Sequence, residues 1–349
     1  MLIKGLLKIK LIIIVSLVII FVTIANIIGS YLFLPGQLLE KKVVIIKEGL
    51  SISQISEVLE QSDIIKHKIL FEFVAKAYAL HRPLRSGEYE FTKAISPYQV
   101  LCLLARGKSV IHRLVIIEGQ TVAEIIAKLN AEERLFGQIN ANIPEGYLMP
   151  STYFYAYGDL RGKIIDQMRN GMTQMLDQVM LKLGADSPLK TRKDVLIFAS
   201  IVEKEAGNDN ERPMIAGALI NRLKRGMKLQ ADPTVNYAVT EGKYKLDRPL
   251  SRADLLIDSK YNTYKVEGLP PGAISCPGLA SLEATAEPAN TDALFFVADG
   301  RGGHSFSSNL DAHNVYVQKL RKREKERAEE REKMDENGRM DVEGKIKDK

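Results

Sequence analysis

DVLIFASIVEKEAG, residues Asp194 to Gly207, is predicted to form a short helix that is apolar on every side. At about 100° per residue, its apolar side chains cover nearly the whole circumference, and such a helix lies in a domain core or in a membrane. It has only about three turns, whereas a bilayer requires roughly 20 apolar residues. We therefore expect a core helix in a domain of mixed α+β structure.

The last turn of this helix carries two carboxyl groups, Glu203 and Glu205. Residues two apart on a helix point to nearly opposite sides, so these two cannot flank one glycosidic bond at the roughly 5–10 Å that a catalytic pair requires. A single carboxyl among apolar side chains has a raised pKa, which suits a general acid. The ordinary alternative is a solvated helix end, because charged residues are mostly exposed. The residues alone do not choose between Glu203 and Glu205.

The composition is that of a globular protein with length for about two domains plus extensions. The 349 residues are 46% hydrophobic and 26% charged, with a net charge of +6 that gives no basic face for nucleic acid. Cys102 and Cys276 lie far apart in sequence, so they form neither a disulfide framework nor a zinc site, and whether they pair stays open. Phosphate-binding glycine motifs are absent. We expect no metal and no cofactor.

An uncharged apolar run from Leu11 to Phe33 has the length of a membrane-spanning helix. A cleaved signal peptide is the alternative, but its apolar region is usually only about 7–15 residues and ends in a small-residue cleavage site. We therefore expect a retained anchor. Lysines stand on both sides of the run, so the positive-inside comparison is close to a tie.

A local pattern occurs twice, 70 residues apart. IKEGLSISQISEVL (Ile46–Leu59) aligns with IIEGQTVAEIIAKL (Ile116–Leu129), and each copy predicts a strand, a Glu-Gly turn and a helix that begins with a capping box. Between the copies we expect a helix, a strand and a second helix, at His67–Leu80, Gly87–Phe91 and Pro97–Gly107. The strand-helix-helix-strand order from about Val43 to Phe91 resembles the LysM carbohydrate-binding module. A small α+β spacer without a ligand is the alternative.

The second half of the chain alternates helices with a long polar region. We expect helices over Lys163–Leu183 and Glu211–Leu223, a loop-rich region over Lys228–Pro277 and a β-hairpin over Ala293–Phe306. His304, in this hairpin, is expected to hydrogen bond with the neighbouring turn. From Lys319 onward, mixed charges predict a frayed solvated helix or disorder.

Several polar side chains of the loop-rich region suit a sugar ligand. Tyrosine offers an apolar face to a pyranose ring and amides pair with its hydroxyl and N-acetyl groups. Residues of this kind are Gln230, Tyr261, Asn262 and Tyr264. A turn with packed tyrosines is the structural alternative.

Six segments together resemble the endolytic murein transglycosylase (YceG-like) family. They are EGYLMPSTY (145–153), ASIVEKEAG (199–207), INRLKRGMKLQADPTVNYA (220–238), LSRADL (250–255), YNTYKVEGLPPGAISCPG (261–278) and FVADGRGGHSFSSNLDAHN (296–314). The resemblance implies a lyase that is held in the cytoplasmic membrane by one helix. It cuts peptidoglycan glycan strands between N-acetylmuramic acid and N-acetylglucosamine without water and leaves 1,6-anhydro-muramic ends. Peptidoglycan synthases are implied as partners.

The resemblance also selects the site residues. Glu205 matches the catalytic glutamate of the family, although Ala206 and Gly207 follow it where the family is usually described with a threonine or similar residue. We expect the glycan to be held by Gln230, Asp232, Asn262, Tyr264 and Glu145. Asp232 could instead cap a helix that starts near Pro233.

The expected architecture is therefore an α+β chain with five segments. These are a cytoplasmic segment (1–10), a transmembrane helix (11–34), a LysM-like α+β domain with the internal repeat (35–135), a catalytic domain on the extracytoplasmic side (140–318) and a charged tail (319–349). Glu205 would act first as acid and then as base while the C6 hydroxyl of the muramic residue closes on C1. Two alternatives remain, a hydrolytic muramidase and a non-enzymatic wall-binding scaffold.

Overall fold

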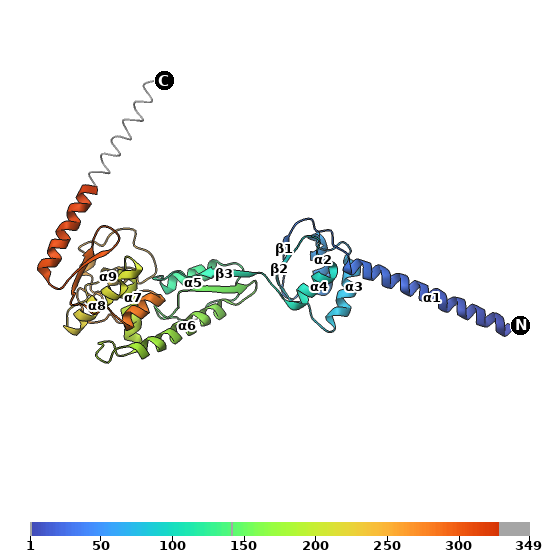
Figure 1. Cartoon of the computed structure of the whole chain (residues 1–349), viewed down its shortest axis with the longest axis horizontal. Coiled ribbons are helices and arrows are strands. Elements are labelled where there is room, and N and C mark those ends of the chain that lie inside the picture. Colours follow the sequence, from blue (N-terminus) through green and yellow to red (C-terminus); the bar gives the residue numbers. More distant parts are fainter. Residues whose placement is uncertain (1, 141, 328–349) are drawn as a thin grey trace, which may run out of the picture. The chain divides into compact units, whose positions relative to one another are not determined.

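The computed structural model describes residues 2–140 and 142–327, and the chain forms two compact units (Figure 1). Unit 1 comprises Met1–Leu114 with two short additions, Arg134–Phe136 and Phe154–Asp159. Unit 2 comprises the remainder of the chain. Each unit has its own hydrophobic core.

The chain begins with helix α1 (Leu2–Phe33). Its 26 residues Lys8–Phe33 make it, among the described residues, the one helix long and apolar enough to cross a membrane. The apolar run expected from Leu11 to Phe33 lies wholly within it. Met1, the first residue of the expected cytoplasmic segment, lies outside the described residues.

Unit 1 contains the strand-helix-helix-strand order that the sequence predicts. The elements are β1 (Lys42–Ile46), α2 (Ile52–Gln61), α3 (Lys68–Ala79), β2 (Gly87–Phe91) and α4 (Pro97–Arg106). Strands β1 and β2 pair antiparallel, with Val44 opposite Tyr89. The fully buried side chains of this core include Phe71, Tyr89, Phe91 and Leu101. Gly107 ends α4 in the left-handed conformation, as expected of a glycine at a helix C-terminus.

The second copy of the repeated pattern also folds as predicted, as β3 (Ile111–Val115) and α5 (Val122–Ala131). Both predicted capping boxes are present, Ser51 with Gln54 and Thr121 with Glu124. Strand β3 pairs with β4 (Thr152–Ala156). The first copy and β3 belong mainly to unit 1, whereas α5 belongs to unit 2. The two copies therefore share local structure and differ in what they pack against.

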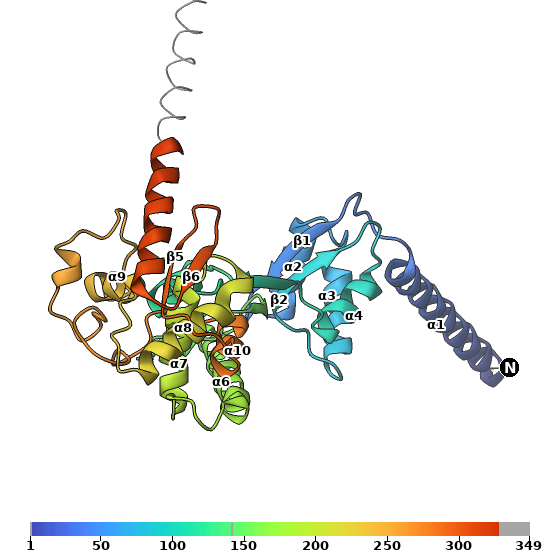
Figure 2. The ribbon, with the colours of Figure 1, turned by 60° about the vertical axis from the view of Figure 1, so that its left-hand side comes forward.

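Unit 2 is built around the predicted all-apolar helix, α7 (Arg192–Glu205). Every residue from Val195 to Val202 is buried, so this helix is enclosed on all sides. Three helices pack against it (Figure 2): α6 (Arg161–Lys182), α8 (Arg212–Lys224) and α10 (Leu279–Ala286). The prediction of a core helix is confirmed.

The predicted loop-rich region, residues 228–277, contains some regular structure. Helix α9 (Asp232–Thr240) lies within it, and short 3-10 turns occur as η2 (Asp254–Leu256) and, after α7, as η1 (Asp209–Glu211). The predicted hairpin forms from β5 (Phe295–Ala298) and β6 (His304–Ser307). A helix over 310–327 follows and lies beside the hairpin (Figure 2), where Arg323 donates to the carbonyl of Asp299. Of the predicted charged tail, residues 328–349 lie outside the described residues.

Truncating Phe198 tests whether α7 is the centre of the unit 2 core. Phe198→Ala removes a fully buried ring and should lower the free energy of unfolding by about 3–5 kcal/mol. Calorimetry of the full chain would measure it. Leu181→Ala, at an exposed position of α6, is the matched control and should stay within about 0.5 kcal/mol of the parent. Equal small effects from both substitutions would contradict the assignment.

Candidate functional site

The end of α7 places Glu203 and Glu205 in two different environments. The helix starts with a capping box between Thr191 and Asp194 and ends at Glu205, after which Ala206 adopts an extended conformation. Ser200, one turn before the end, is buried and accepts a hydrogen bond from the backbone N–H of Ile274 at 3.1 Å. This bond joins the end of α7 to the polar loop that precedes α10.

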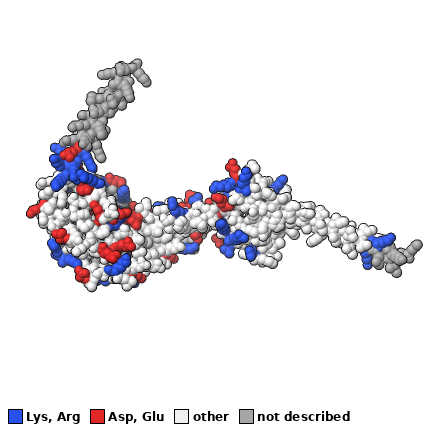
Figure 3. Space-filling view, viewed as in Figure 1, with Lys and Arg blue, Asp and Glu red and all other residues white. Residues whose placement is uncertain are grey.

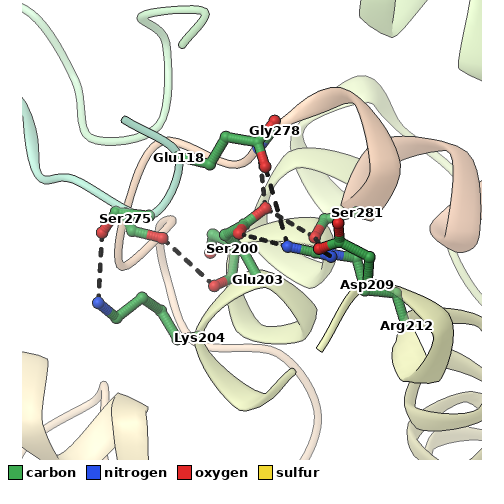
Figure 4. Close-up of polar contacts among 10 residues, drawn as sticks. Glu118, Ser200, Glu203, Lys204, Asp209, Arg212, Ser275, Gly278 and Ser281 are labelled. Carbon is green, nitrogen blue, oxygen red and sulfur yellow. Dashed lines mark hydrogen bonds and ion pairs between the residues drawn. The ribbon is translucent and has the colours of Figure 1, made fainter. Parts of the chain in front are cut away.

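Glu203 is fully paired inside the protein (Figure 4). Its side chain is 5% exposed and accepts a hydrogen bond from Arg212 at 3.1 Å. Its other oxygen accepts from the backbone N–H of Gly278 at 2.9 Å and from the Ser281 hydroxyl at 2.7 Å. A carboxylate with a guanidinium partner and two further donors is stabilised in its charged form. Glu203 therefore links α7, α8 and the start of α10, and all of its carboxylate contacts lie inside the protein.

Two further carboxylates surround the same guanidinium. Arg212 also pairs with Asp209, which lies one turn earlier, and approaches Glu118 at 3.8 Å. The pKa of Glu118 is raised, first by burial and then by the negative charge of Glu203. Arg212, which is 8% exposed, is thus the cationic centre of this cluster (Figure 4).

Glu205 lies in an environment of the opposite kind. Within the part of the chain that the structure describes, no group hydrogen bonds to its carboxyl and no cation pairs with it directly. Burial raises its pKa from the ordinary 4.5 to about 8, the negative charge of Asp232 adds to this rise, and the positive charge of Arg222 opposes it. At neutral pH this carboxyl is therefore protonated. A protonated, unpaired carboxyl is able to act as a general acid.

Arg222 is the cation whose positive charge lowers the pKa of Glu205. The sequence did not predict this role. The guanidinium is buried, donates to the backbone carbonyls of Leu294 and Leu229 at 2.6 Å each, and stacks over the Phe295 ring at 5.3 Å. These contacts hold it between the hairpin and the loop before α9. Burial lowers its pKa, while Glu205 and Tyr264 raise it. Nothing in the stretch INRLKRG distinguishes this arginine from its basic neighbours.

The structure brings Asp232 and Tyr264 together beside Glu205. The Tyr264 hydroxyl donates to the Asp232 carboxylate at 2.5 Å. The pKa of Tyr264 is raised by burial, by this bond and by the charges of Asp232 and Glu205. The alternative role of Asp232 as a helix cap is wrong, because the capping position is Ala231 and has no side-chain bond. Asp232 is exposed, so its carboxylate is open to a ligand.

Asn262 is not placed to contact a ligand. It is fully buried, and its amide nitrogen donates to the carbonyls of Leu255 and Ile257 at 3.0 and 2.9 Å. Its amide oxygen accepts from the backbone N–H of Tyr264 at 3.0 Å. All of its polar atoms are used within the loop. Asn262 therefore fixes the loop that carries Tyr264, which differs from the direct contact that the sequence suggested.

Gln230 and Glu145 have different surroundings from each other. Gln230 is exposed and adopts a left-handed conformation (φ 48°), with its backbone N–H bonded to the Thr263 carbonyl at 3.1 Å. Glu145 is half-buried and accepts from the backbone N–H of Val122 at 2.9 Å, at the start of α5. Its charge is not among those that shift the pKa of Glu205. Cys276 approaches Glu145 at 3.9 Å, and burial raises the pKa of this thiol.

The hairpin histidine has a different partner from the expected one. His304 Nδ1 lies 2.9 Å from the Glu211 carboxylate, and its backbone N–H donates to the same carboxylate at 2.6 Å. Asn208 donates to the carbonyl of Gly302 in the same hairpin turn. The ring of His304 therefore contacts Glu211 of η1, whereas a hydrogen bond with the neighbouring turn was expected. These contacts attach the hairpin to the segment that follows Glu205.

An open cleft of about 320 Å³ in unit 2 is lined in part by Lys204, Pro233, Tyr237, Asn236 and Glu118. Glu205, Asp232 and Tyr264 are not among its lining residues. Tyr237 stacks with Tyr261 at 4.8 Å between ring centroids. Amide, hydroxyl and aromatic groups of this kind suit a polar polymer. Within residues 2–140 and 142–327, no group of three or more His, Cys, Asp or Glu side chains is placed to hold a metal ion.

Comparison with known proteins gives consistent matches. Residues 44–319 match the sequence profile of the YceG-like family. A Bacillus subtilis protein named endolytic murein transglycosylase is 32% identical over 306 residues, which cover 78% of this chain and 83% of that protein. A Streptococcus pneumoniae D39 protein of the same name is 30% identical, over 76% of this chain and 55% of its own length, so the chain spans about half of that relative. A crystal structure of a YceG-like protein from Listeria monocytogenes shares 32% identity, with 79% of this chain and 99% of that chain covered and a TM-score of 0.49.

Breaking the buried ion pair between Glu203 and Arg212 should lower the free energy of unfolding. Arg212→Met leaves the Glu203 charge buried without its cation and should cost about 3–5 kcal/mol of unfolding free energy. Adding Glu203→Gln removes that charge and should recover part of the loss. Urea denaturation would measure both. The control on the same helix, Lys224→Met, breaks an exposed pair with Asp186 and should cost no more than about 1 kcal/mol.

Proposed function

This chain belongs to the YceG-like family, and from that premise we propose that it is a lytic transglycosylase that cuts peptidoglycan glycan strands within the chain. Relatives named endolytic murein transglycosylase, matched over about three quarters of the sequence, support the activity. The observation that carries the mechanism is the contrast between the two glutamates of α7. Glu203 is ion-paired, whereas Glu205 is unpaired and has a pKa of about 8.

In the proposed reaction, Glu205 is the only group that moves a proton. Its carboxyl gives a proton to the glycosidic oxygen as the bond to C1 of the muramic residue breaks toward an oxocarbenium-like state. The C6 hydroxyl of the same residue then attacks C1, and the Glu205 carboxylate takes the hydroxyl proton. The products are a 1,6-anhydro-muramic end and a free hydroxyl on the neighbouring sugar. The proton returns to Glu205, so the carboxyl is ready for the next cycle.

Arg222 supports both halves of this cycle. Its charge lies close enough to influence the pKa of Glu205 but forms no ion pair with it among the described residues, so Glu205 can be protonated at the start. When Glu205 has given up its proton, the guanidinium stabilises the new carboxylate in a site of low dielectric constant. A direct ion pair would instead have favoured the charged form of Glu205 from the start.

The glycan is proposed to contact the exposed polar groups beside Glu205. Asp232 and Tyr264 are the contacts supported by this arrangement, because the exposed Asp232 carboxylate acts on Glu205 and accepts a hydrogen bond from the half-buried Tyr264 hydroxyl. Gln230, exposed two residues before Asp232, is proposed as a further contact. Asn262 contributes by fixing the Tyr264 loop, and Glu145 by holding the start of α5. The intramolecular nucleophile makes a second carboxylate unnecessary.

The position of the enzyme in the cell follows from its substrate. We propose that α1 anchors the chain in the cytoplasmic membrane with the N-terminus in the cytoplasm, because peptidoglycan lies outside. Unit 1 is proposed to assist in holding the glycan, in line with its LysM-like order of elements. A groove of about 710 Å³ on β2 and α4, whose lining combines apolar side chains with Glu90, Gln99 and Arg106, supports this role. Peptidoglycan synthases remain proposed partners.

A second candidate is a hydrolase of the retaining type. It is favoured by one observation, the influence of the Asp232 carboxylate on Glu205, since retaining glycosidases use a second carboxylate as nucleophile at about 5–5.5 Å. Digestion in heavy-oxygen water separates the two. Hydrolysis places the heavy oxygen in the new reducing end, whereas the lytic reaction incorporates none and gives a product lighter by one water.

Replacing the acid tests the assignment. Glu205→Gln is nearly isosteric and should lower the rate of glycan cleavage by at least about 10²- to 10⁴-fold, because the amide has no proton to donate. Mass spectrometry of digested glycan strands measures the products, and circular dichroism checks the fold. Glu283→Gln, an exposed change on α10, should leave the rate unchanged. Normal digestion by Glu205→Gln would sink the proposal.

The pH dependence provides an independent test. Because the proposed acid has a pKa of about 8, cleavage should persist to about pH 8 and then fall by about tenfold per pH unit as Glu205 loses its proton. Asp232→Asn removes a charge that raises this pKa, so the alkaline limb should move to lower pH while cleavage continues. Asp292→Asn, whose charge does not act on Glu205, should leave the limb in place. Complete loss of cleavage with Asp232→Asn would instead favour the retaining hydrolase.

The raised pKa of Glu205 also makes the free energy of unfolding depend on pH. The folded state holds the Glu205 proton up to about pH 8 and the unfolded chain only to about 4.5, so the folded state binds more protons between these values. The contribution to stability is full below pH 4.5 and is lost as the pH rises through 8. Glu205→Gln should remove this part of the pH dependence, which chemical denaturation at several pH values would detect.

A further inference from the structure

Helix α3 has one buried face and one face that is exposed and apolar. Phe71 and Ala75 are fully buried in the unit 1 core. Ile69 and Phe73, which are one turn apart, are 83% and 66% exposed. Leu80, just past the end of the helix, is 82% exposed. Single exposed apolar residues need no explanation, but a large apolar stripe on one face indicates a surface that is covered in use.

The beginning of α3 is attached to the end of α1. The Tyr31 hydroxyl donates to the carbonyl of His67, the residue before α3, at 3.2 Å, and the two rings lie 5.9 Å apart. Phe33 contacts Tyr98 of α4 with ring centroids 5.0 Å apart. Figure 1 shows α3 at the edge of unit 1 where α1 joins it. The exposed stripe therefore starts beside the last turn of α1.

The length of α1 fixes the level of this junction in a membrane. Its 26 residues Lys8–Phe33 extend about 39 Å at 1.5 Å per residue, which is longer than the hydrocarbon core of about 30 Å. Both ends therefore reach the layer of lipid headgroups. Figure 3 shows α1 without charged atoms between the basic groups near its N-terminus and unit 1. Tyr31 and Phe33, at the other end, are aromatic side chains of the type found at the membrane surface.

A groove continues the apolar surface from α1 to α3. It has a volume of about 460 Å³ and is lined in part by Ile27, Tyr31, Leu34, Ile64 and Leu70. Ile27 belongs to the membrane-spanning part of α1, so the groove opens at the depth of the lipid chains. Basic residues border the stripe, with Lys66 exposed before α3 and Arg82 exposed after it. Such residues favour the anionic headgroups of a membrane surface.

We propose that the exposed face of α3, with Ile69 and Phe73, rests on the lipid bilayer that α1 enters. The inference depends on the proposed anchoring by α1 and goes beyond the proposed catalysis. The occupant is lipid, because the Tyr31–His67 hydrogen bond and the groove join the stripe to the membrane-spanning helix. A polar glycan, in contrast, would gain little from exposed Ile and Phe side chains. Unit 1 is then held flat at the membrane surface and does not swing freely on α1.

The absence of tryptophan from the sequence permits a direct test. Phe73→Trp in the full chain introduces a single indole, which is read by its fluorescence in lipid nanodiscs that hold one copy. If the face rests on lipid, the indole should be buried about 5–10 Å below the headgroup boundary. Its emission should shift to shorter wavelength, and lipids brominated on their upper acyl carbons should quench it. Leu181→Trp, 88% exposed on α6, is the control and should show neither effect.

Each outcome decides a different point. Ile69→Trp is the second reporter and should behave like Phe73→Trp if the first variant folds poorly. Failure of the chain to float with liposomes would overturn the anchor and this inference, and would leave the proposed catalysis in place. Flotation without quenching at either reporter would overturn the inference alone. A blue shift that requires two copies per nanodisc, with no quenching by brominated lipid, would assign the face to a second copy and also overturn it.

Discussion

The ion pair between Glu203 and Arg212 is the interaction on which the arrangement of unit 2 depends. It joins the end of a helix that is buried on every side to α8, and the bonds to Gly278 and Ser281 add the start of α10. A buried carboxylate is tolerated only when its charge and its lone pairs are satisfied, and here three elements of the fold, α7, α8 and α10, meet at one side chain. The end of α7 is thereby fixed in position. Glu205, two residues further on, can then be held in a site where none of the residues that the structure describes pairs with its carboxyl.

This contrast explains how one helix end can carry two glutamates in different electrostatic environments. Glu203 receives its charge compensation at 3.1 Å, whereas Glu205 is surrounded by protein and lies near a carboxylate. Arg222 is kept at a distance by the carbonyls of Leu294 and Leu229, which use its donors. The backbone of the hairpin and of the loop before α9 therefore fixes the position of the Arg222 charge relative to the Glu205 carboxyl. In this way the protonation of the site depends on segments far from it in sequence.

Local signals in the sequence were sufficient for most of the secondary structure. The capping boxes at Ser51 and Thr121, the glycine after α4 and the all-apolar pattern of α7 each act within a few residues, so they could be identified before any packing was known. Helix α9 was harder to assign because it is short and lies in a polar region, where its pattern resembles a loop. The division of the repeat between the two units could not be predicted, since it depends on which surfaces each copy packs against.

The site was predicted in part, and the errors have a common cause. Side-chain type indicated that Asp232 and Tyr264 could meet a polar ligand, and the structure places them together beside Glu205. The same reasoning treated Asn262 as a ligand contact, although its amide is used by the backbone of its own loop. It also overlooked Arg222, because a buried arginine and an exposed one look alike in sequence. Residue type alone does not reveal which hydrogen bonds are already made inside the protein.

The burial of Cys276 limits the reactivity of its thiol with disulfides and oxidants. Its thiol is fully buried and its pKa is raised, so almost no thiolate is present to attack a disulfide or an oxidant. Cys102, in the other unit, is half-buried beside Tyr78. Under the proposed topology the catalytic unit lies outside the cytoplasm, where free thiols can be oxidised to disulfides. Each unit carries one free cysteine, and the burial of Cys276 protects its thiol from forming a wrong disulfide. Alkylating reagents should accordingly label Cys102 first, and reaction at Cys276 would report that unit 2 has opened.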